Sequence, residues 1–185
     1  PTGAVLTKED LIGISEVIKR HDLLVISDEI YADLLYDDAY TSMASLEGMK
    51  ARTLLVSGFS KAFAMTGWRL GYVCGPTALI AEMLKIHQYT IMSAPTMAQY
   101  GAIEALENGL SEVEMMKESY KQRRNYVVKT LTRMGLDCHM PGGAFYVFPS
   151  IKSTGLTSSA FAERLLMEEK VAVVPGNVFG DSGEG

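Results

Sequence analysis

The chain has 185 residues, of which 48% are hydrophobic and 21% are charged, and its formal net charge at pH 7 is −5. This composition excludes an intrinsically disordered chain, and the negative balance gives no electrostatic reason to expect nucleic-acid binding. No apolar run approaches the roughly 20 residues of a membrane-spanning helix, so we expect no membrane association. The two cysteines, Cys74 and Cys138, lack the spacing of metal ligands and are typical of a reducing compartment, which predicts a cytoplasmic protein.

The first half of the chain is predicted to alternate helices with buried strands. Thr7 and Asp10 have the spacing of a capping box before an apolar-periodic stretch, which predicts a helix over residues 7–20. Continuous apolar runs predict strands that are buried on both faces, as in a parallel sheet. These strands are expected at 23–26, 53–56 and 70–74, and further helices at 77–86 and 94–108. The pattern predicts an α/β fold.

The second half has a different pattern, from which we expect a separate, smaller α/β unit. Ser111 and Glu114 have capping-box spacing at the start of a long helix that runs to about Met134 and ends at Gly135. Another helix is predicted at 158–169, and strands at 137–139, 144–148 and 171–174. We therefore expect a larger domain over residues 1–109 and a smaller domain over residues 110–185.

Polar side chains gather where the first two predicted strands end, which is where open α/β sheets bind their ligands. The residues are Asp28, Glu29 and Tyr31 after the first strand, and Ser57, Ser60, Lys61 and Arg69 at and beyond the second. Each has an ordinary structural explanation when it is taken alone. A loop lysine is usually solvated, an aspartate after a strand often caps a turn, and an arginine often forms an ion pair.

Taken together, these residues fit the requirements of pyridoxal phosphate. The cofactor needs a lysine that forms a Schiff base, an acid beside its pyridinium nitrogen, and cationic and hydroxyl groups for its phosphate. Lys61 fits the first requirement, Asp28 the second, and Arg69 with Ser60 the third, while Tyr31 is placed to hydrogen-bond the phenolate oxygen of the ring. The spacing alone leaves open whether these residues form a site or are unrelated turn and surface residues.

Several stretches resemble a known family. Residues 57–72, Ser-Gly-Phe-Ser-Lys-Ala-Phe-Ala-Met-Thr-Gly-Trp-Arg-Leu-Gly-Tyr, resemble the cofactor-attachment motif of class I/II aminotransferases, most closely in their aspartate/aromatic branch. Residues 27–31 are similar to the family's cofactor-ring motif. Other matches are residues 1–3, which resemble the end of an Asn-Pro-Thr-Gly turn, 141–146, which resemble a small-domain strand, and 175–180, which resemble a loop before the arginine that binds the substrate carboxylate. The resemblance implies part of the aspartate-aminotransferase-like three-layer α/β/α large domain, followed by a smaller α/β C-terminal domain.

The resemblance also implies roles for individual residues. Lys61 is the catalytic residue, since it forms the Schiff base with pyridoxal 5'-phosphate, and Asp28 pairs with the pyridinium nitrogen. Tyr31 donates to the phenolate oxygen, and Ser60 and Arg69 hold the phosphate. Ser57 is a weaker phosphate candidate, because its offset from the lysine varies within the family.

The resemblance implies a reaction that transfers an amino group from an amino acid to a 2-oxo acid. It also implies a homodimer and a role in amino acid metabolism and biosynthesis. A metal site is not expected, because the three histidines share no spacing.

The resemblance further predicts that the chain is the carboxyl-terminal half of an aminotransferase without its last segment. The family's cofactor-contacting asparagine would stand immediately before Pro1. Its carboxylate-binding arginine would follow a motif like residues 183–185. We therefore expect the isolated fragment to be inactive.

Two other functions remain open. A carbon–sulfur β-lyase would share the lysine and the aspartate, because the cofactor performs the chemistry. An aminotransferase-like sensor domain of a transcription regulator would have a winged-helix DNA-binding domain upstream. The Met-Thr-Gly-Trp-Arg stretch at 65–69 favours the aminotransferase by its resemblance to that family.

Overall fold

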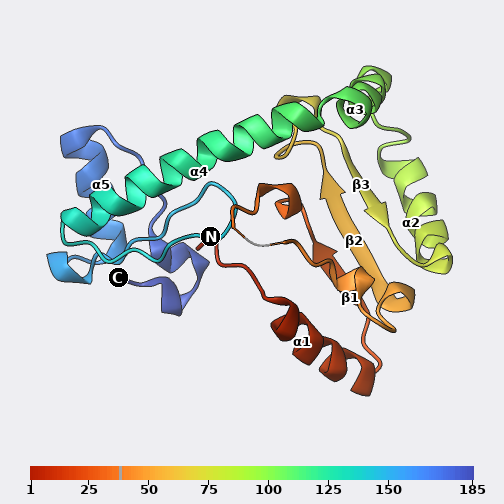
Figure 1. Cartoon of the computed structure of the whole chain (residues 1–185), viewed down its shortest axis with the longest axis horizontal. Helices are drawn as coiled ribbons and strands as arrows, with labels where there is room; N and C mark the ends of the chain where they lie inside the picture. Colours follow the sequence, from red (N-terminus) through yellow and green to blue (C-terminus); the bar gives the residue numbers. More distant parts are fainter. Residues whose placement is uncertain (38) are drawn as a thin grey trace. The chain divides into compact units, whose positions relative to one another are not determined.

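The computed structural model describes residues 1–37 and 39–185, which form two compact units. One unit is Val5–Glu118, and the other combines Pro1–Ala4 with Ser119–Gly185. The long helix α4 (Leu110–Arg133) contributes residues to both units (Figure 1). The division of the whole protein into domains near residue 109 stays a prediction.

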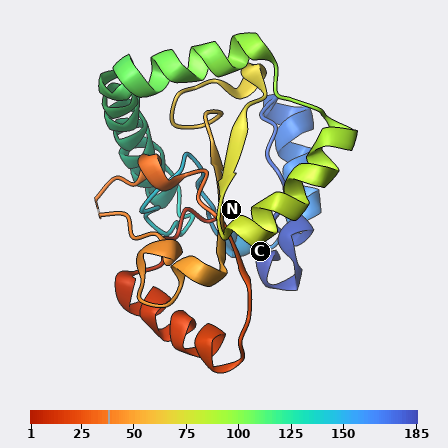
Figure 2. The ribbon, with the colours of Figure 1, turned by 90° about the vertical axis from the view of Figure 1, so that its right-hand side faces the viewer.

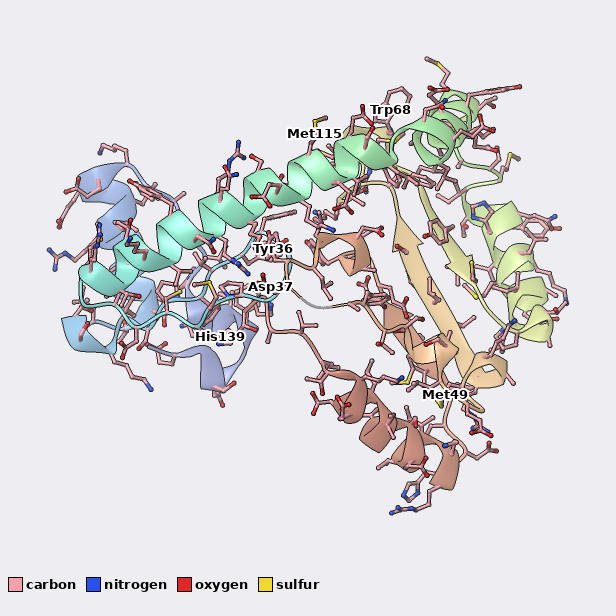
Figure 3. All side chains as sticks on the ribbon, viewed as in Figure 1. Tyr36, Asp37, Met49, Trp68, Met115 and His139 are labelled. Atoms are coloured by element: carbon pink, nitrogen blue, oxygen red, sulfur yellow. The ribbon has the colours of Figure 1, made fainter. Side chains whose placement is uncertain are left out.

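Helix α1 (Lys8–Arg20) opens the larger unit and confirms the predicted capping box. The Asp10 backbone N–H donates to the Thr7 hydroxyl at 3.1 Å, and the Thr7 backbone N–H donates to the Asp10 carboxylate at 2.9 Å. The apolar face of α1 buries Leu11 and Ile18 in a cluster with Met43 and Met49, the latter labelled in Figure 3. This cluster fixes α1 beside the segment that enters the second strand.

The larger unit contains a three-stranded sheet with the order β1-β2-β3 (Figure 1), and Figure 2 shows the same ribbon turned by 90°. The strands are β1 (Val25–Asp28), β2 (Thr53–Gly58) and β3 (Gly71–Cys74), and β1 begins two residues later than predicted. Strands β1 and β2 are parallel, with Asp28 opposite Val56, whereas β3 runs antiparallel to β2. The carboxyl ends of β1 and β2 therefore meet at one edge of the sheet.

The expectation that the first strand is buried on both faces is wrong for this chain. Burial alternates along β1, and Ile26 has 75% of its surface exposed. Leu24, just before the strand, is 66% exposed. Because alternate side chains of a strand point to opposite faces, these values identify one face of β1 that the described residues leave uncovered.

Two helices follow the sheet, α2 (Thr77–Thr90) and α3 (Thr96–Asn108), and both confirm predicted helices. Helix α3 packs against the loop that follows β2. Phe59 and Met65 from this loop are buried with Ala102 of α3, and partly buried apolar side chains surround them. The helix thus supports the segment that contains Lys61.

The start of α4 differs from the predicted capping box. The helix begins at Leu110, so Ser111 lies inside it, and its hydroxyl donates to the neighbouring Glu112 carboxylate at 2.7 Å. The predicted end of this helix is confirmed, because Gly135 follows with a φ of +82°, in the left-handed region that favours glycine. Helix α5 (Ser158–Glu169) also matches its prediction, with Thr157 as the N-cap.

The short strands predicted in the second half are wrong. The described residues after 109 form no strand, although an isolated antiparallel bridge joins Cys138 to Pro149. A strand needs a partner for its backbone groups, and the predicted segment 171–174 has its three valines exposed. Ala144 has a φ of +57°, which interrupts extended backbone at the start of another predicted strand.

The smaller unit brings two of the quoted motifs together. The backbone N–H groups of Gly142 and Gly143 donate to the carbonyl oxygen of Gly3 at 2.9 Å and 3.2 Å. Arg124, which is only 8% exposed, donates to the Pro141 carbonyl oxygen at 2.7 Å from α4. The first residues of the chain are therefore packed against the turn at 141–143.

Candidate active site

The ends of β1 and β2 position the first group of candidate residues. Asp28 is the last residue of β1, and the next backbone N–H, of Glu29, donates to the Val56 carbonyl oxygen at 2.8 Å. Ser57 follows Val56 in β2, and its hydroxyl makes a long hydrogen bond of 3.4 Å to the Glu29 carbonyl oxygen. Asp28 and Ser57 thus lie at adjacent positions of paired strands.

Lys61 and Tyr31 come together from the loops that follow these two strands. The Lys61 Nζ atom lies 5.7 Å from the centre of the Tyr31 ring, and both residues are partly buried. This distance is within the range of about 6 Å at which an ammonium group interacts with an aromatic face. Tyr31 immediately precedes the short helical turn Ala32–Leu34, which fixes its backbone.

Asp28 combines a turn-forming role with an exposed carboxylate. Its Oδ1 atom accepts from the Ile30 backbone N–H at 3.2 Å. This contact stabilises the turn that leads to Tyr31. The carboxylate is exposed at the edge where the two strands end, so the turn contact is compatible with the predicted functional role.

The loop from Ser60 to Arg69 carries the remaining candidates. The Thr66 hydroxyl donates to the Ser60 carbonyl oxygen at 2.7 Å, and the Arg69 guanidinium donates from Nη1 to the Thr66 carbonyl oxygen at 2.8 Å. Ala64 and Arg69 have φ values of +53° and +55°. Non-glycine residues rarely adopt this left-handed conformation, which persists only where surrounding contacts enforce it.

The sequence pattern did not assign a role to the hydrogen-bonded group around Glu29. This carboxylate is only 7% exposed, and it accepts from the hydroxyls of Ser27 at 3.0 Å and Ser42 at 2.8 Å. Burial and the hydrogen bond with Glu29 raise the pKa of Tyr40 well above its ordinary value. Ser42 and Tyr40 are distant from Glu29 in sequence, so no local spacing could have revealed the group.

The chemistry of the donor set fits pyridoxal phosphate. Within one compact unit, the ends of β1 and β2 and the loops that follow them carry an amine, a carboxylate, a phenol, serine hydroxyls and a guanidinium. These are the groups that an aldehyde, a pyridinium nitrogen, a phenolate oxygen and a phosphate require. The fit does not extend to metals: across residues 1–37 and 39–185, no three His, Cys, Asp or Glu side chains are grouped so that they could hold an ion.

The same described residues contain no helix that is both long and apolar enough to cross a bilayer.

Comparison with known proteins gives one consistent result. The family model for aminotransferase class I and II matches residues 1–185. The chain is 62% identical over 185 residues to a putative aminotransferase, YugH, of Bacillus subtilis, and 53% identical over 188 residues to an aspartate aminotransferase of Pyrococcus abyssi. All of this chain and 48% of each of these two proteins are covered, so the chain spans about half the length of the curated relatives it matches.

A solved structure agrees with the sequence relatives. The crystal structure of an aromatic aminotransferase from Pyrococcus horikoshii superimposes with a TM-score of 0.96 at 53% identity, covering all of this chain and 50% of that one. The predicted aspartate-aminotransferase-like α/β fold is thereby confirmed. The match over the full chain places this protein with the aspartate and aromatic branch, and it belongs to the class I and II aminotransferase family.

Proposed function

We propose that this chain is part of a pyridoxal-phosphate-dependent aminotransferase that moves an amino group from an amino acid to a 2-oxo acid. The observation that carries the proposal is the Lys61 amine over the Tyr31 ring, at the sheet edge where Asp28 ends the neighbouring strand. Membership of the family and the names of the relatives support the same class of reaction.

Lys61 has two tasks in this proposal. Its amine would hold the cofactor by condensing with the aldehyde, whose oxygen leaves as water. With cofactor and substrate bound, Nζ would be the base that takes the proton from the substrate α-carbon, holds it as an ammonium group, and returns it during the transfer. When bound, pyridoxal phosphate supplies the electron-accepting ring that stabilises the charge left on that carbon.

The neighbouring residues hold the cofactor for this chemistry. The Asp28 carboxylate keeps the ring nitrogen protonated, and the Tyr31 hydroxyl donates to the ring oxygen. Arg69 offers a planar set of N–H donors to the phosphate, and Ser60 offers a hydroxyl. Ser57 is a weaker phosphate candidate, since its hydroxyl is directed to the Glu29 carbonyl oxygen.

The wider setting is also part of the proposal. The family resemblance implies a homodimer that acts in amino acid metabolism and biosynthesis. The two free cysteines are typical of a reducing compartment, which favours the cytoplasm. A carbon–sulfur β-lyase would use the same lysine and aspartate. The relatives named above are aminotransferases, and that favours amino transfer over elimination.

The test uses the full-length protein loaded with pyridoxal phosphate and a panel of amino acids and 2-oxo acids. We expect a visible absorption band from the lysine–cofactor linkage and 2-oxo-acid-dependent amino transfer, both lost in Lys61→Ala. The matched control is Lys85→Ala, which removes an exposed lysine of α2 that is ion-paired to Glu82.

Two outcomes would contradict the assignment. Amino transfer that persists in Lys61→Ala would remove Lys61 from the chemistry. Pyruvate release from cystathionine without amino transfer would instead identify a β-lyase.

A further inference from the structure

Thr66 makes hydrogen bonds toward both ends of the loop that contains Lys61. Its hydroxyl donates to the Ser60 carbonyl oxygen at 2.7 Å, while its own carbonyl oxygen accepts from Arg69 Nη1 at 2.8 Å. Ser60 and Arg69 are the two principal phosphate candidates. A single residue therefore links the backbone of one candidate to the side chain of the other.

The backbone of this loop needs such a link. Ala64 and Arg69 both have left-handed conformations, which non-glycine residues hold only when other contacts enforce them. Three backbone hydrogen bonds also close the loop: Ala64 to Lys61, Met65 to Phe59 and Trp68 to Met65, at 3.1–3.2 Å. The hydroxyl bond of Thr66 is shorter than these and ends on the residue directly before Lys61.

Apolar packing supports a different part of the loop. Met65 is buried with Phe59 and Ala102, and Trp68, labelled in Figure 3, lies against Gly101 of α3. A Cβ atom added to Gly101 would be 3.1 Å from the Trp68 ring. This packing fixes the middle of the loop on α3, but it does not orient the hydroxyl of Ser60 or the guanidinium of Arg69.

We propose that Thr66 is a positioning residue for phosphate binding: its hydroxyl fixes Ser60 relative to Arg69, so that both donors face one phosphate group. The proposal rests on the proposed function, which assigns Ser60 and Arg69 to the phosphate of the cofactor. Thr66 acts through these two residues. Its removal should therefore weaken the binding of a ligand with a phosphate more than that of the same ligand without one.

The test compares two ligands that differ only in that group, pyridoxal phosphate and pyridoxal, on the full-length protein. Thr66→Val removes the hydroxyl with little change in shape, and Thr66→Ser keeps it. We expect Thr66→Val to raise the Kd for pyridoxal phosphate about 5- to 10-fold, the effect of one lost hydrogen bond. The Kd for pyridoxal should change less than about twofold, and Thr66→Ser should resemble the unaltered protein.

Thr90→Val is the matched control, because the Thr90 hydroxyl also donates to a backbone carbonyl oxygen, that of Ile86 in α2, at 3.0 Å. It should leave both Kd values unchanged. Equal weakening of both ligands by Thr66→Val would show a general structural role and overturn the positioning role, as would unchanged binding of both. If the unaltered protein bound neither ligand, the proposed function itself would be wrong, and the role of Thr66 with it.

Discussion

The amine of Lys61 lies 5.7 Å from the centre of the Tyr31 ring, although the two residues belong to loops that follow different strands. The parallel pairing of β1 with β2, with Asp28 opposite Val56, brings these loops to the same edge of the sheet. Thr66 and α3 then hold the second loop in place. Pairing of two strands thus assembles residues that the sequence separates.

Tyr31→Phe should separate the role of the aromatic ring from the role of the hydroxyl. The phenylalanine keeps an aromatic face beside the Lys61 amine but loses the hydroxyl that donates to the ring oxygen of the cofactor. We expect the covalent attachment of the cofactor to survive and kcat to fall about 10-fold. Steady-state kinetics of the full-length protein measure this, with exposed Tyr100→Phe as the control. An unchanged kcat would show that the Tyr31 hydroxyl has no role in the reaction.

Asp28→Asn should remove a charge without removing the turn. The asparagine Oδ1 can still accept from the Ile30 backbone N–H, as the carboxylate does. The neutral amide cannot hold the proton on the ring nitrogen, so we expect kcat to fall on the order of 10²- to 10³-fold. Asp33→Asn, in the adjacent helical turn, is the control. If both variants lost activity equally, Asp28 would have no special role.

Tyr40 should make the protein sensitive to alkali. Burial and the hydrogen bond with Glu29 raise the pKa of Tyr40 above the ordinary 10.0. As the pH rises above this value, the unfolded chain loses the tyrosine proton before the folded protein does. The stabilisation from this group is therefore complete below pH 10 and is lost progressively above it.

Urea unfolding of the full-length protein at a series of pH values measures this loss. We expect Tyr40→Phe to be somewhat less stable at pH 7, because a hydrogen bond is gone, but to show a shallower decline above pH 10. Parallel declines in the two proteins would show that Tyr40 does not account for the alkaline sensitivity.

Gly3→Ala should destabilise the smaller unit. Gly3 has a φ of +69°, and a Cβ atom there would lie 2.5 Å from the Pro141 Cβ atom. The left-handed conformation and the overlap together should lower the free energy of unfolding by about 2 to 5 kcal/mol. Urea unfolding measures the change.

The control for this substitution is Gly13→Ala in α1, where an added Cβ atom meets nothing within 4 Å. Helix propensity predicts that this variant is more stable by up to about 1 kcal/mol. Destabilisation of similar size in both variants would contradict the packing of Gly3 against Pro141.

Local signals predicted much of the fold. The Thr7–Asp10 capping box, the start and end of α5, and the glycine after α4 are all confirmed, because each depends on residues close together in sequence. The strands expected after residue 109 are wrong, because a strand also requires a partner. Ser111 shows the same limit at a helix end, since its spacing suits a cap but its hydroxyl bonds to Glu112.

The candidate site, too, could be predicted only in part from the sequence. The residue types of Lys61, Asp28 and Arg69, together with their places at or beyond the ends of predicted strands, indicated the cofactor chemistry. The contacts of Thr66 depend on the left-handed backbone at Ala64 and Arg69, which no sequence pattern predicts. The hydrogen-bonded group around Glu29 depends on Ser42, which lies 13 residues further along the chain. The assignment of the site residues stays a prediction.

Covalent attachment of pyridoxal phosphate to Lys61 is the central claim, and it can be read directly. The full-length protein is loaded with pyridoxal phosphate, reduced with borohydride to make the linkage permanent, digested, and mapped by mass spectrometry. We predict that the pyridoxyl group is found on the peptide that contains Lys61, at that residue. A pyridoxyl group on a different lysine, or a cofactor that is retained without any covalent label, would contradict the account.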